Sequence, residues 1–192
     1  MILAVDQPVP SALAHATVLD ATGAEVPLAR CWADRDALLV FVRHFGCRGC
    51  SEHVAALRPR LDELAALDVR VALIGNGNAQ YLAAFVEREQ LADYAIDVFT
   101  DPTLAAYRAA DFERTWLGTI GPRALAGVAG LALRGFASPG IHGDLTQQGG
   151  TLYITRAGVL AFYHRSARVG DNAHVVDVVD VALAARATEQ LA

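Results

Sequence analysis

The sequence has few cysteines, no excess of positive charge and no long apolar run, and each absence excludes a class of protein. Its 192 residues contain 16 Lys+Arg against 21 Asp+Glu, a formal net charge of −5. Binding to a phosphate backbone needs clustered positive charge, so nucleic acid is not expected as a partner. Three cysteines are too few for the disulfide framework of a small secreted protein.

We also expect no segment for export or for membrane insertion. The first residues show no cationic segment followed by a long apolar run, and Asp6 and Pro8 interrupt the little hydrophobicity present. The most apolar later stretch, residues 117–136, contains a proline, two arginines and five glycines. It never approaches the ~20 uninterrupted apolar residues of a membrane span. We therefore expect a soluble, cytoplasmic protein with no membrane partner.

What the sequence does contain is enough apolar residues for one sizeable core. Apolar residues make up 54% of the chain, and we expect a single domain spanning residues 1–192. Segments typical of strands alternate with segments typical of amphipathic helices, which predicts an α/β fold. We expect a mixed central sheet with helices on both faces and an N-terminal hairpin.

The expected elements can be placed along the chain. The hairpin comprises residues 16–19 and 25–28, and the continuously apolar segment 37–42 predicts a central strand that is covered on both faces. Apolar residues at helical spacing predict a helix from about residue 47 to 67, kinked at Pro59. The other expected elements are strands at 69–74, 95–99, 151–155 and 159–163 and helices at 79–91, 103–109 and around 175–183.

Residues 111–150 form the least regular part of the chain. This segment is rich in glycine and alanine and is long for a simple connection, so we expect a lid or a small helical insertion. If it folds over the site described next, Trp116 and Phe136 would supply apolar walls for an uncharged or lipid-like oxidant. Alternatively, these aromatic side chains fill a gap in the core or a dimer contact.

The candidate chemistry lies at Cys47-Arg48-Gly49-Cys50, at the turn from the central strand into a helix. The positive end of a helix and its unpaired N–H groups stabilise a thiolate, so Cys47 is predicted to be the lower-pKa thiol. Cys50 lies one turn further on, close enough to resolve a sulfenic acid or mixed disulfide on Cys47. Arg43 and Arg48 add nearby positive charge. The spacing predicts a redox-active dithiol.

Two other interpretations of this pair stay open. The cysteines could be ordinary small core residues, or they could bind zinc together with His44 and His53, since structural zinc takes four nitrogen or sulfur ligands. Against zinc, His53 is expected to point away from Cys47 and to be a partly exposed helix residue. Cys31 is predicted to be a buried structural thiol, and no metal or organic cofactor is expected.

The run LVFVRHFGCRGCSEH at residues 39–53 resembles the peroxiredoxin-like, selenoprotein U-related branch of the AhpC/TSA group in the thioredoxin superfamily. The resemblance continues through residues 71–75, 101–102 with Tyr107, 148–151 and 163–165, and so covers most of the chain from about Gln7. Typical peroxiredoxins have proline and threonine where this chain has Val40 and His44. Thioredoxins have a cis-proline where it has Gly150, just before the strand that begins at Thr151.

The resemblance implies a thioredoxin-like fold with Cys47 as the nucleophile and Cys50 as the resolving thiol. It implies a thiol-dependent oxidoreductase that reduces peroxides or disulfides, and an antioxidant role; some relatives are credited with reducing lipid endoperoxides. Arg43, His44, Gly150 and Thr151 are the expected supporting residues. The expected partners are an external reductant of the thioredoxin or glutathione type and a peroxide or disulfide substrate, and a homodimer is compatible with these features. The alternative is a non-enzymatic binding module or a zinc-holding protein.

Overall fold

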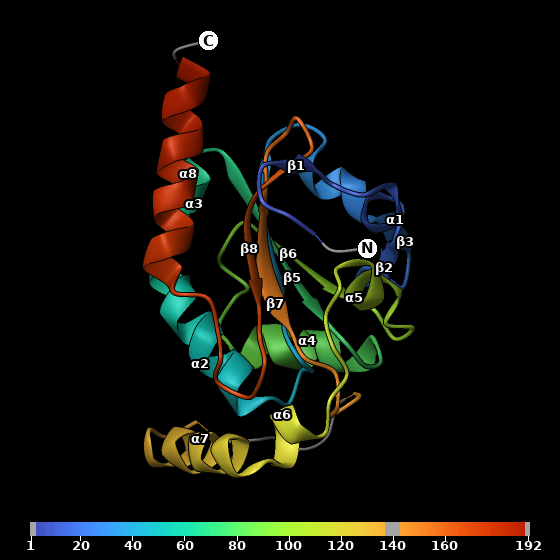
Figure 1. Ribbon diagram of the computed structural model, residues 1–192, viewed down its shortest axis with the longest axis vertical. Coiled ribbons are helices and arrows are strands. Elements are labelled where there is room, and N and C mark those ends of the chain that lie inside the picture. Colours follow the sequence, from blue (N-terminus) through green and yellow to red (C-terminus); the bar gives the residue numbers. More distant parts are fainter. Residues whose placement is uncertain (1–2, 137–142, 191–192) are drawn as a thin grey trace.

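A computed structural model describes residues 3–136 and 143–190 of the chain. Figure 1 shows one twisted sheet with helices on both of its faces. The eight strands lie in the order β1-β8-β7-β4-β5-β6-β2-β3. They are β1 (Gln7–Pro8), β2 (Thr17–Leu19), β3 (Glu25–Pro27), β4 (Asp36–Phe41), β5 (Val69–Gly75), β6 (Ile96–Thr100), β7 (Gly150–Ile154) and β8 (Val159–Arg165).

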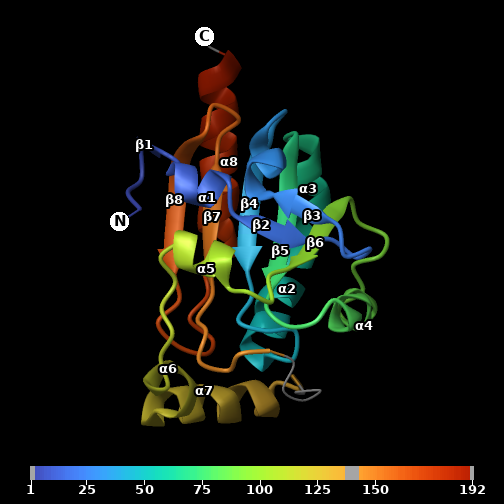
Figure 2. The same ribbon diagram turned by 90° about the vertical axis from the view of Figure 1, so that its right-hand side faces the viewer.

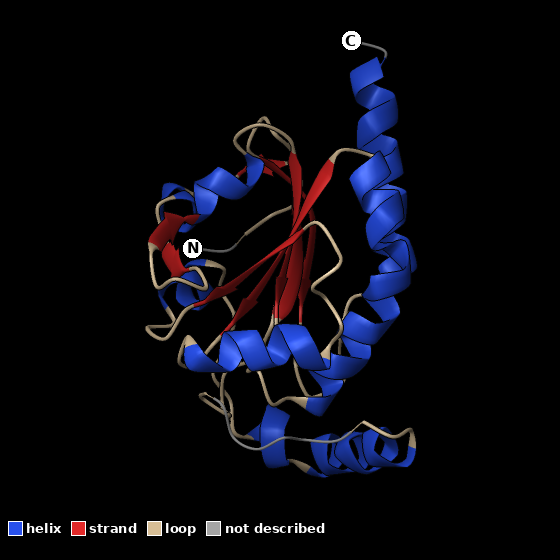
Figure 3. Ribbon diagram, turned by 180° about the vertical axis from the view of Figure 1, so that it is seen from behind, coloured by secondary structure: helices blue, strands red, loops and turns tan. Residues whose placement is uncertain are grey.

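The helices fall into two layers and a group at one end of the sheet (Figure 3). Helices α2 (Arg48–Leu57), α3 (Leu61–Ala66), α4 (Gln80–Arg88) and α8 (Val175–Gln190) contribute to the core on one face. The other face is covered by α1 (Ser11–Ala14), the 3₁₀ helix η1 (Leu28–Trp32) and α5 (Ala105–Ala109). Helices α6 (Leu117–Ile120) and α7 (Pro122–Leu133) lie across the end of the sheet near the start of α2 (Figure 1).

Strand β4 is buried on both faces because its side chains alternate between two apolar cores. Leu39 and Phe41 belong to the core under α1 and α5, whereas Leu38 and Val40 belong to the core under α2 and α8. Successive side chains of a strand point to opposite faces of the sheet, so a strand covered on both sides has to be apolar throughout. The continuous apolar run in the sequence therefore marked the centre of the sheet.

The strand directions bring two distant segments together at the end of the sheet that carries the candidate site. Strands β4 and β5 run parallel, and β7 runs antiparallel to β4 with Phe41 opposite Gly150. The loop that leaves β4 toward the cysteines therefore lies beside the segment that enters β7 (Figure 2). Tyr107 links the ends of β4 and β5, because its buried hydroxyl lies within hydrogen-bond distance of the Val42 carbonyl oxygen (2.6 Å) and the Ile74 carbonyl oxygen (2.9 Å).

The expected fold class is confirmed: an α/β protein with a mixed sheet, helices on both faces and an N-terminal hairpin formed by β2 and β3. The expected kink at Pro59 is a 3₁₀ turn (Arg58–Arg60) that separates α2 from α3, since proline cannot donate the helical hydrogen bond. Strand β1, helix α1 and η1 were not predicted, because each is too short for a periodic pattern. None of the described helices is long and apolar enough to span a lipid bilayer.

Candidate active site

Cys47 and Cys50 lie at the start of α2, as the sequence predicts. Cys47 is the N-cap residue with extended backbone angles (φ −79°, ψ 121°), and the helix begins at Arg48. The Cys47 N–H donates to the His44 carbonyl at 3.0 Å and its carbonyl accepts from Ser51 at 3.1 Å, so the chain turns directly from the loop into the helix. Both cysteines are buried and neither forms a disulfide.

The polar groups around the two sulfurs separate their pKa values. A hydrogen bond from the Cys50 side chain is the largest cause that lowers the pKa of Cys47, and the charge of Arg43 and the N–H groups of Cys50 and Gly49 act with it against burial. Burial raises the pKa of Cys50, and the neighbouring Cys47 raises it further. Cys47 is therefore the thiol with the lower pKa, in the direction that its helix position predicts.

Arg43 connects the cysteines to the segment before β7. Its guanidinium donates to the Thr119 hydroxyl (2.6 Å), to the Leu145 carbonyl (2.6 Å) and to the Gln147 carbonyl (3.2 Å). Its backbone N–H donates to the Cys50 sulfur at 3.2 Å. The arginine is 5% exposed, so its charge acts where water screens it little. The expected supporting residue thus lies beside both thiols.

His44 shapes the turn and is absent from the lining of the cavity beside the cysteines. The residue is buried, and its Nδ1 atom accepts a hydrogen bond from the Gly46 N–H at 3.2 Å while its carbonyl accepts from Cys47. This arrangement fixes the loop that presents Cys47.

A small cavity opens beside the dithiol. Its volume of about 10 Å³ is roughly that needed for a single water molecule. Cys47, Cys50 and Arg43 line it together with Gly149 and residues of the loop after β8. Gly149 rather than Gly150 or Thr151 faces this cavity, and a β-carbon at Gly149 would overlap the Phe41 carbonyl oxygen. The two expected residues instead pair with Phe41 and Val40 in the sheet.

His53 lines the same cavity as Cys47, and the expectation that it is partly exposed is wrong because the residue is buried. The side chain is 7% exposed, and burial, followed by the nearby His164, lowers its pKa to about 4. The loop between β8 and α8 covers this face of α2, which the spacing of one helix could not reveal. Within residues 3–136 and 143–190, no three histidine, cysteine, aspartate or glutamate side chains gather in a way that could hold a metal ion.

The loop of residues 166–172 forms one wall of the cavity. The sequence patterns did not predict this role. The Asn172 side-chain amide donates to the Gly49 carbonyl at 3.0 Å, and the Ser166 N–H donates to the Gly149 carbonyl at 3.1 Å. A β-carbon at Gly49 would lie 2.8 Å from the Gly170 nitrogen, so only a glycine permits this approach. Glycine and asparagine just after a strand are turn signals, but they do not indicate what the turn covers.

The segment of residues 111–150 contacts the site through polar atoms rather than through its aromatic side chains. Thr119 of α6 contacts Arg43, and Arg134, just after α7, forms an ion pair with Glu52 of α2 at 2.7 Å. Trp116 is 62% exposed, and neither it nor Phe136 lines the cavity beside Cys47. Residues 137–142 of this segment lie outside the described residues.

The third cysteine, Cys31, lies in a different environment from Cys47 and Cys50. It is buried in the core on the opposite face of the sheet, and burial, followed by the negative charge of Asp97, raises its pKa to about 12. These surroundings are those of the structural thiol that the sequence predicts.

Comparison with known proteins gives a consistent result. A family model described as AhpC/TSA antioxidant enzyme matches residues 56–168, so the match begins after Cys50. The thioredoxin-like protein AAED1 of Arabidopsis thaliana is 36% identical over 107 residues, which cover 56% of this chain and 42% of that protein. Human peroxiredoxin-like 2C is 31% identical over 170 residues, which cover 83% of this chain and 74% of that protein. The chain thus spans less than half the length of the plant relative.

Solved structures share the fold. The bacterioferritin comigratory protein of Xanthomonas campestris, described by its alkyl peroxide reduction activity, superposes with a TM-score of 0.67 and 14% identity. The aligned region covers 95% of this chain and 99% of that protein.

Proposed function

The chain belongs to the AhpC/TSA antioxidant enzyme family and is a peroxiredoxin-like enzyme, and we propose that it reduces peroxides or disulfides through Cys47 and Cys50. The observation that carries this proposal is the pairing of the two thiols: Cys47 caps a helix, and the Cys50 side chain hydrogen-bonds to it while Arg43 supplies positive charge. A thiolate is the nucleophile in such reactions, and these contacts stabilise it in Cys47 rather than in Cys50.

The first step with a peroxide is attack by the Cys47 thiolate on one peroxide oxygen. A sulfur–oxygen bond forms and the oxygen–oxygen bond breaks. The departing alkoxide of an organic hydroperoxide takes a proton and leaves as an alcohol, and the hydroxide from hydrogen peroxide leaves as water. Cys50 then attacks the sulfenic acid on Cys47, a disulfide forms, and the hydroxyl leaves as water with the Cys50 proton. With a disulfide substrate, the Cys47 thiolate attacks one sulfur, the substrate S–S bond breaks, and the first substrate thiol takes a proton and leaves. Cys50 then attacks the Cys47 sulfur of the mixed disulfide, the second substrate thiol leaves with the Cys50 proton, and the Cys47–Cys50 disulfide forms.

An external thiol reductant of the thioredoxin or glutathione type returns the disulfide to the dithiol. The alkyl peroxide reduction described for the Xanthomonas protein supports a peroxide as the oxidant. A reducing compartment such as the cytoplasm suits this cycle, and cell fractionation tests that part of the proposal. A homodimer stays a prediction, which light scattering tests.

Turnover of hydrogen peroxide, organic hydroperoxides and insulin disulfide, each with a regenerating thiol system, tests the proposal. The wild type should turn over at least one of these substrates, and Cys47→Ser should abolish turnover. Cys50→Ser should accumulate a sulfenic acid on Cys47, detected as a dimedone adduct by mass spectrometry. Cys31→Ser is the matched control and should keep wild-type turnover, since Cys31 lies in the other core.

Two results would contradict the proposal. Turnover that survives in Cys47→Ser would remove the attacking role from this thiol. One tightly held zinc ion per chain, found by elemental analysis of protein purified without chelator, would favour the metal-holding alternative.

A further inference from the structure

Arg43 is held in place by the insertion and not by its own loop. Among the described residues, the acceptors of its guanidinium are Thr119, Leu145 and Gln147, and all of them come from the segment between α5 and β7. A buried guanidinium needs acceptors for its N–H groups, and its position follows theirs. The location of the positive charge beside Cys47 is therefore decided by residues 76 or more positions further along the chain.

Thr119 has a double role in this arrangement. Its hydroxyl oxygen accepts from Arg43 Nη2 at 2.6 Å, while the hydroxyl donates to the Leu145 carbonyl at 2.7 Å. Arg43 Nη2 donates to that same carbonyl. The guanidinium, the hydroxyl and the Leu145 carbonyl therefore contact one another pairwise. The hydroxyl accepts a hydrogen bond from Arg43 and also holds the Leu145 carbonyl, the other acceptor of Nη2, beside it.

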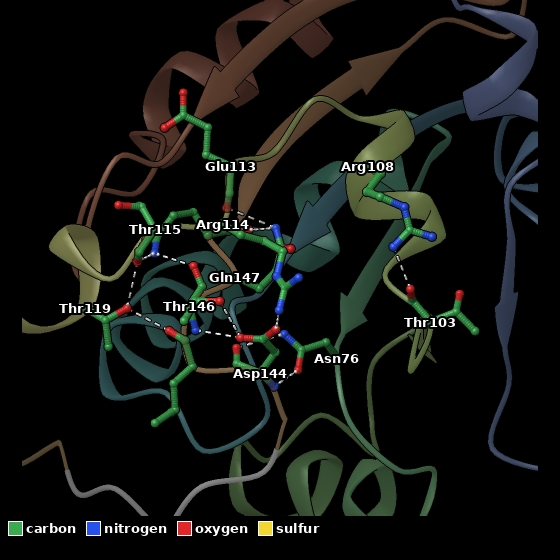
Figure 4. A network of polar contacts seen from close by, with 12 residues as sticks. Asn76, Thr103, Arg108, Glu113, Arg114, Thr115, Thr119, Asp144, Thr146 and Gln147 are labelled. Carbon is green, nitrogen blue, oxygen red and sulfur yellow. Dashed lines mark hydrogen bonds and ion pairs between the residues drawn. The ribbon is translucent and has the colours of Figure 1, made fainter.

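The segment that carries Leu145 is anchored to the central sheet (Figure 4). Asn76, directly after β5, accepts from the Asp144 N–H at 2.6 Å and donates to the Arg43 carbonyl. Asp144 in turn accepts from the Thr146 N–H (2.8 Å) and hydroxyl (2.6 Å) and pairs with Arg114. These contacts hold Asp144, the neighbour of Leu145, next to the central sheet, and Thr119 is the contact by which α6 reaches Arg43.

We propose that Thr119 is a positioning residue for the dithiol: its hydroxyl keeps the Arg43 guanidinium beside the Cys47 sulfur. This inference rests on the proposed role of Cys47 as the attacking thiolate. Loss of the hydroxyl removes one acceptor of Arg43 and frees the Leu145 carbonyl from its second donor. The guanidinium then shifts toward water, and the charge that favours the thiolate moves away with it.

The experiment compares Thr119→Val with Thr119→Ser, which keeps the hydroxyl, and with Thr188→Val, which removes an exposed hydroxyl of α8. Pulsed alkylation with iodoacetamide and mass mapping measures the rate at Cys47 between pH 5 and 10. Thr119→Val should lower the rate near pH 6.5 by about tenfold, as expected for the loss of one neighbouring opposite charge, and leave it unchanged near pH 9.5. Thr119→Ser and Thr188→Val should both retain the wild-type pH profile.

A purely structural role of Thr119 gives a different result. A loosened insertion would raise the alkylation rate at every pH, since Cys47 would become more exposed, and an unchanged profile in Thr119→Val would equally overturn the proposal. If Thr119→Val fails to fold, Thr119→Ala serves in the same assay with less steric disturbance. The assay needs no peroxide turnover, so a wild type without turnover defeats the proposed function and not this inference.

Discussion

The two faces of the central sheet each bury cysteine, but they treat it in opposite ways. Cys31 belongs to η1 on one face, and Cys47 and Cys50 lie at the start of α2 on the other, all of them 5% exposed or less. Burial raises the pKa of Cys31 to about 12, whereas the contacts of Cys47 lower its pKa in spite of similar burial. Burial alone therefore does not decide thiol reactivity; the groups that face the sulfur do.

The largest expected difference between the two faces is the rate of thiol labelling at neutral pH. With a pKa of about 12, only about one Cys31 in 10⁵ is a thiolate at pH 7, so Cys47 should be alkylated at least ~10³-fold faster. The alkylation rate of Cys47 should stay high at pH values below the pKa of an ordinary thiol. It should fall only as the pH drops through the lowered pKa of Cys47. Mass mapping after pulsed alkylation measures both rates. Equal rates for the two residues would contradict the comparison.

Removal of the positive charge beside Cys47 should make its alkylation rate more similar to that of Cys31. Arg43→Met should lower the alkylation rate of Cys47 near pH 6.5 by about 10- to 100-fold, because the cation that favours the thiolate is lost. Arg70→Met is the matched control, since Arg70 acts on Cys31 and not on Cys47. An Arg43→Met profile that coincides with that of Arg70→Met would show that the charge plays no part.

The face of the sheet that carries the dithiol also buries a titratable base, His53, so the two faces should differ in how their stability depends on pH. The pKa of His53 falls from 6.5 to about 4 on burial, so stability is not reduced by this group above pH 6.5, falls progressively as the pH drops from 6.5 to about 4 because the unfolded state binds the proton first, and changes no further below about 4. His53→Leu should therefore lessen the acid destabilisation between pH 7 and 4.5 by about 1–2 kcal/mol. Urea unfolding at the two pH values measures it, with the exposed His15→Leu as control. An undiminished loss of stability in His53→Leu would refute the role of this histidine.

The smallest effect is expected on the other face. Cys31→Ala removes one fully buried sulfur from a packed core, which should cost about 1 kcal/mol of unfolding free energy. Turnover and the alkylation rate of Cys47 should stay at the wild-type level, because the sheet separates the two cores. Urea unfolding and the turnover assay check the two parts, and a loss of turnover without a loss of stability would assign Cys31 a role in the reaction.

Local sequence patterns determined the main elements and the position of the dithiol. The apolar run at residues 37–42 marked the strand buried on both faces, and Pro59 marked the break between α2 and α3. Two short strand patterns on either side of a turn that contains Gly23 marked the hairpin. The place of Cys47 at a helix start followed in the same way. Each of these features depends on residues within about one or two turns of one another, so a local pattern carries it.

The surroundings of the sulfurs were decided only by the tertiary structure. Arg43 meets Thr119 across 76 positions and Gln147 across 104, and Asn172 meets Gly49 across 123. No periodicity within one element specifies such contacts, and for this reason the covered face of His53, the loop of residues 166–172 and the hold of Thr119 on Arg43 were missed. The sequence alone determined which thiols lie at the helix start and which of them has the lower pKa, because the groups that lower the pKa of Cys47 lie within four positions of it. The contacts between distant segments decided where the Arg43 guanidinium lies and what covers the dithiol, because those partners come from other elements of the fold.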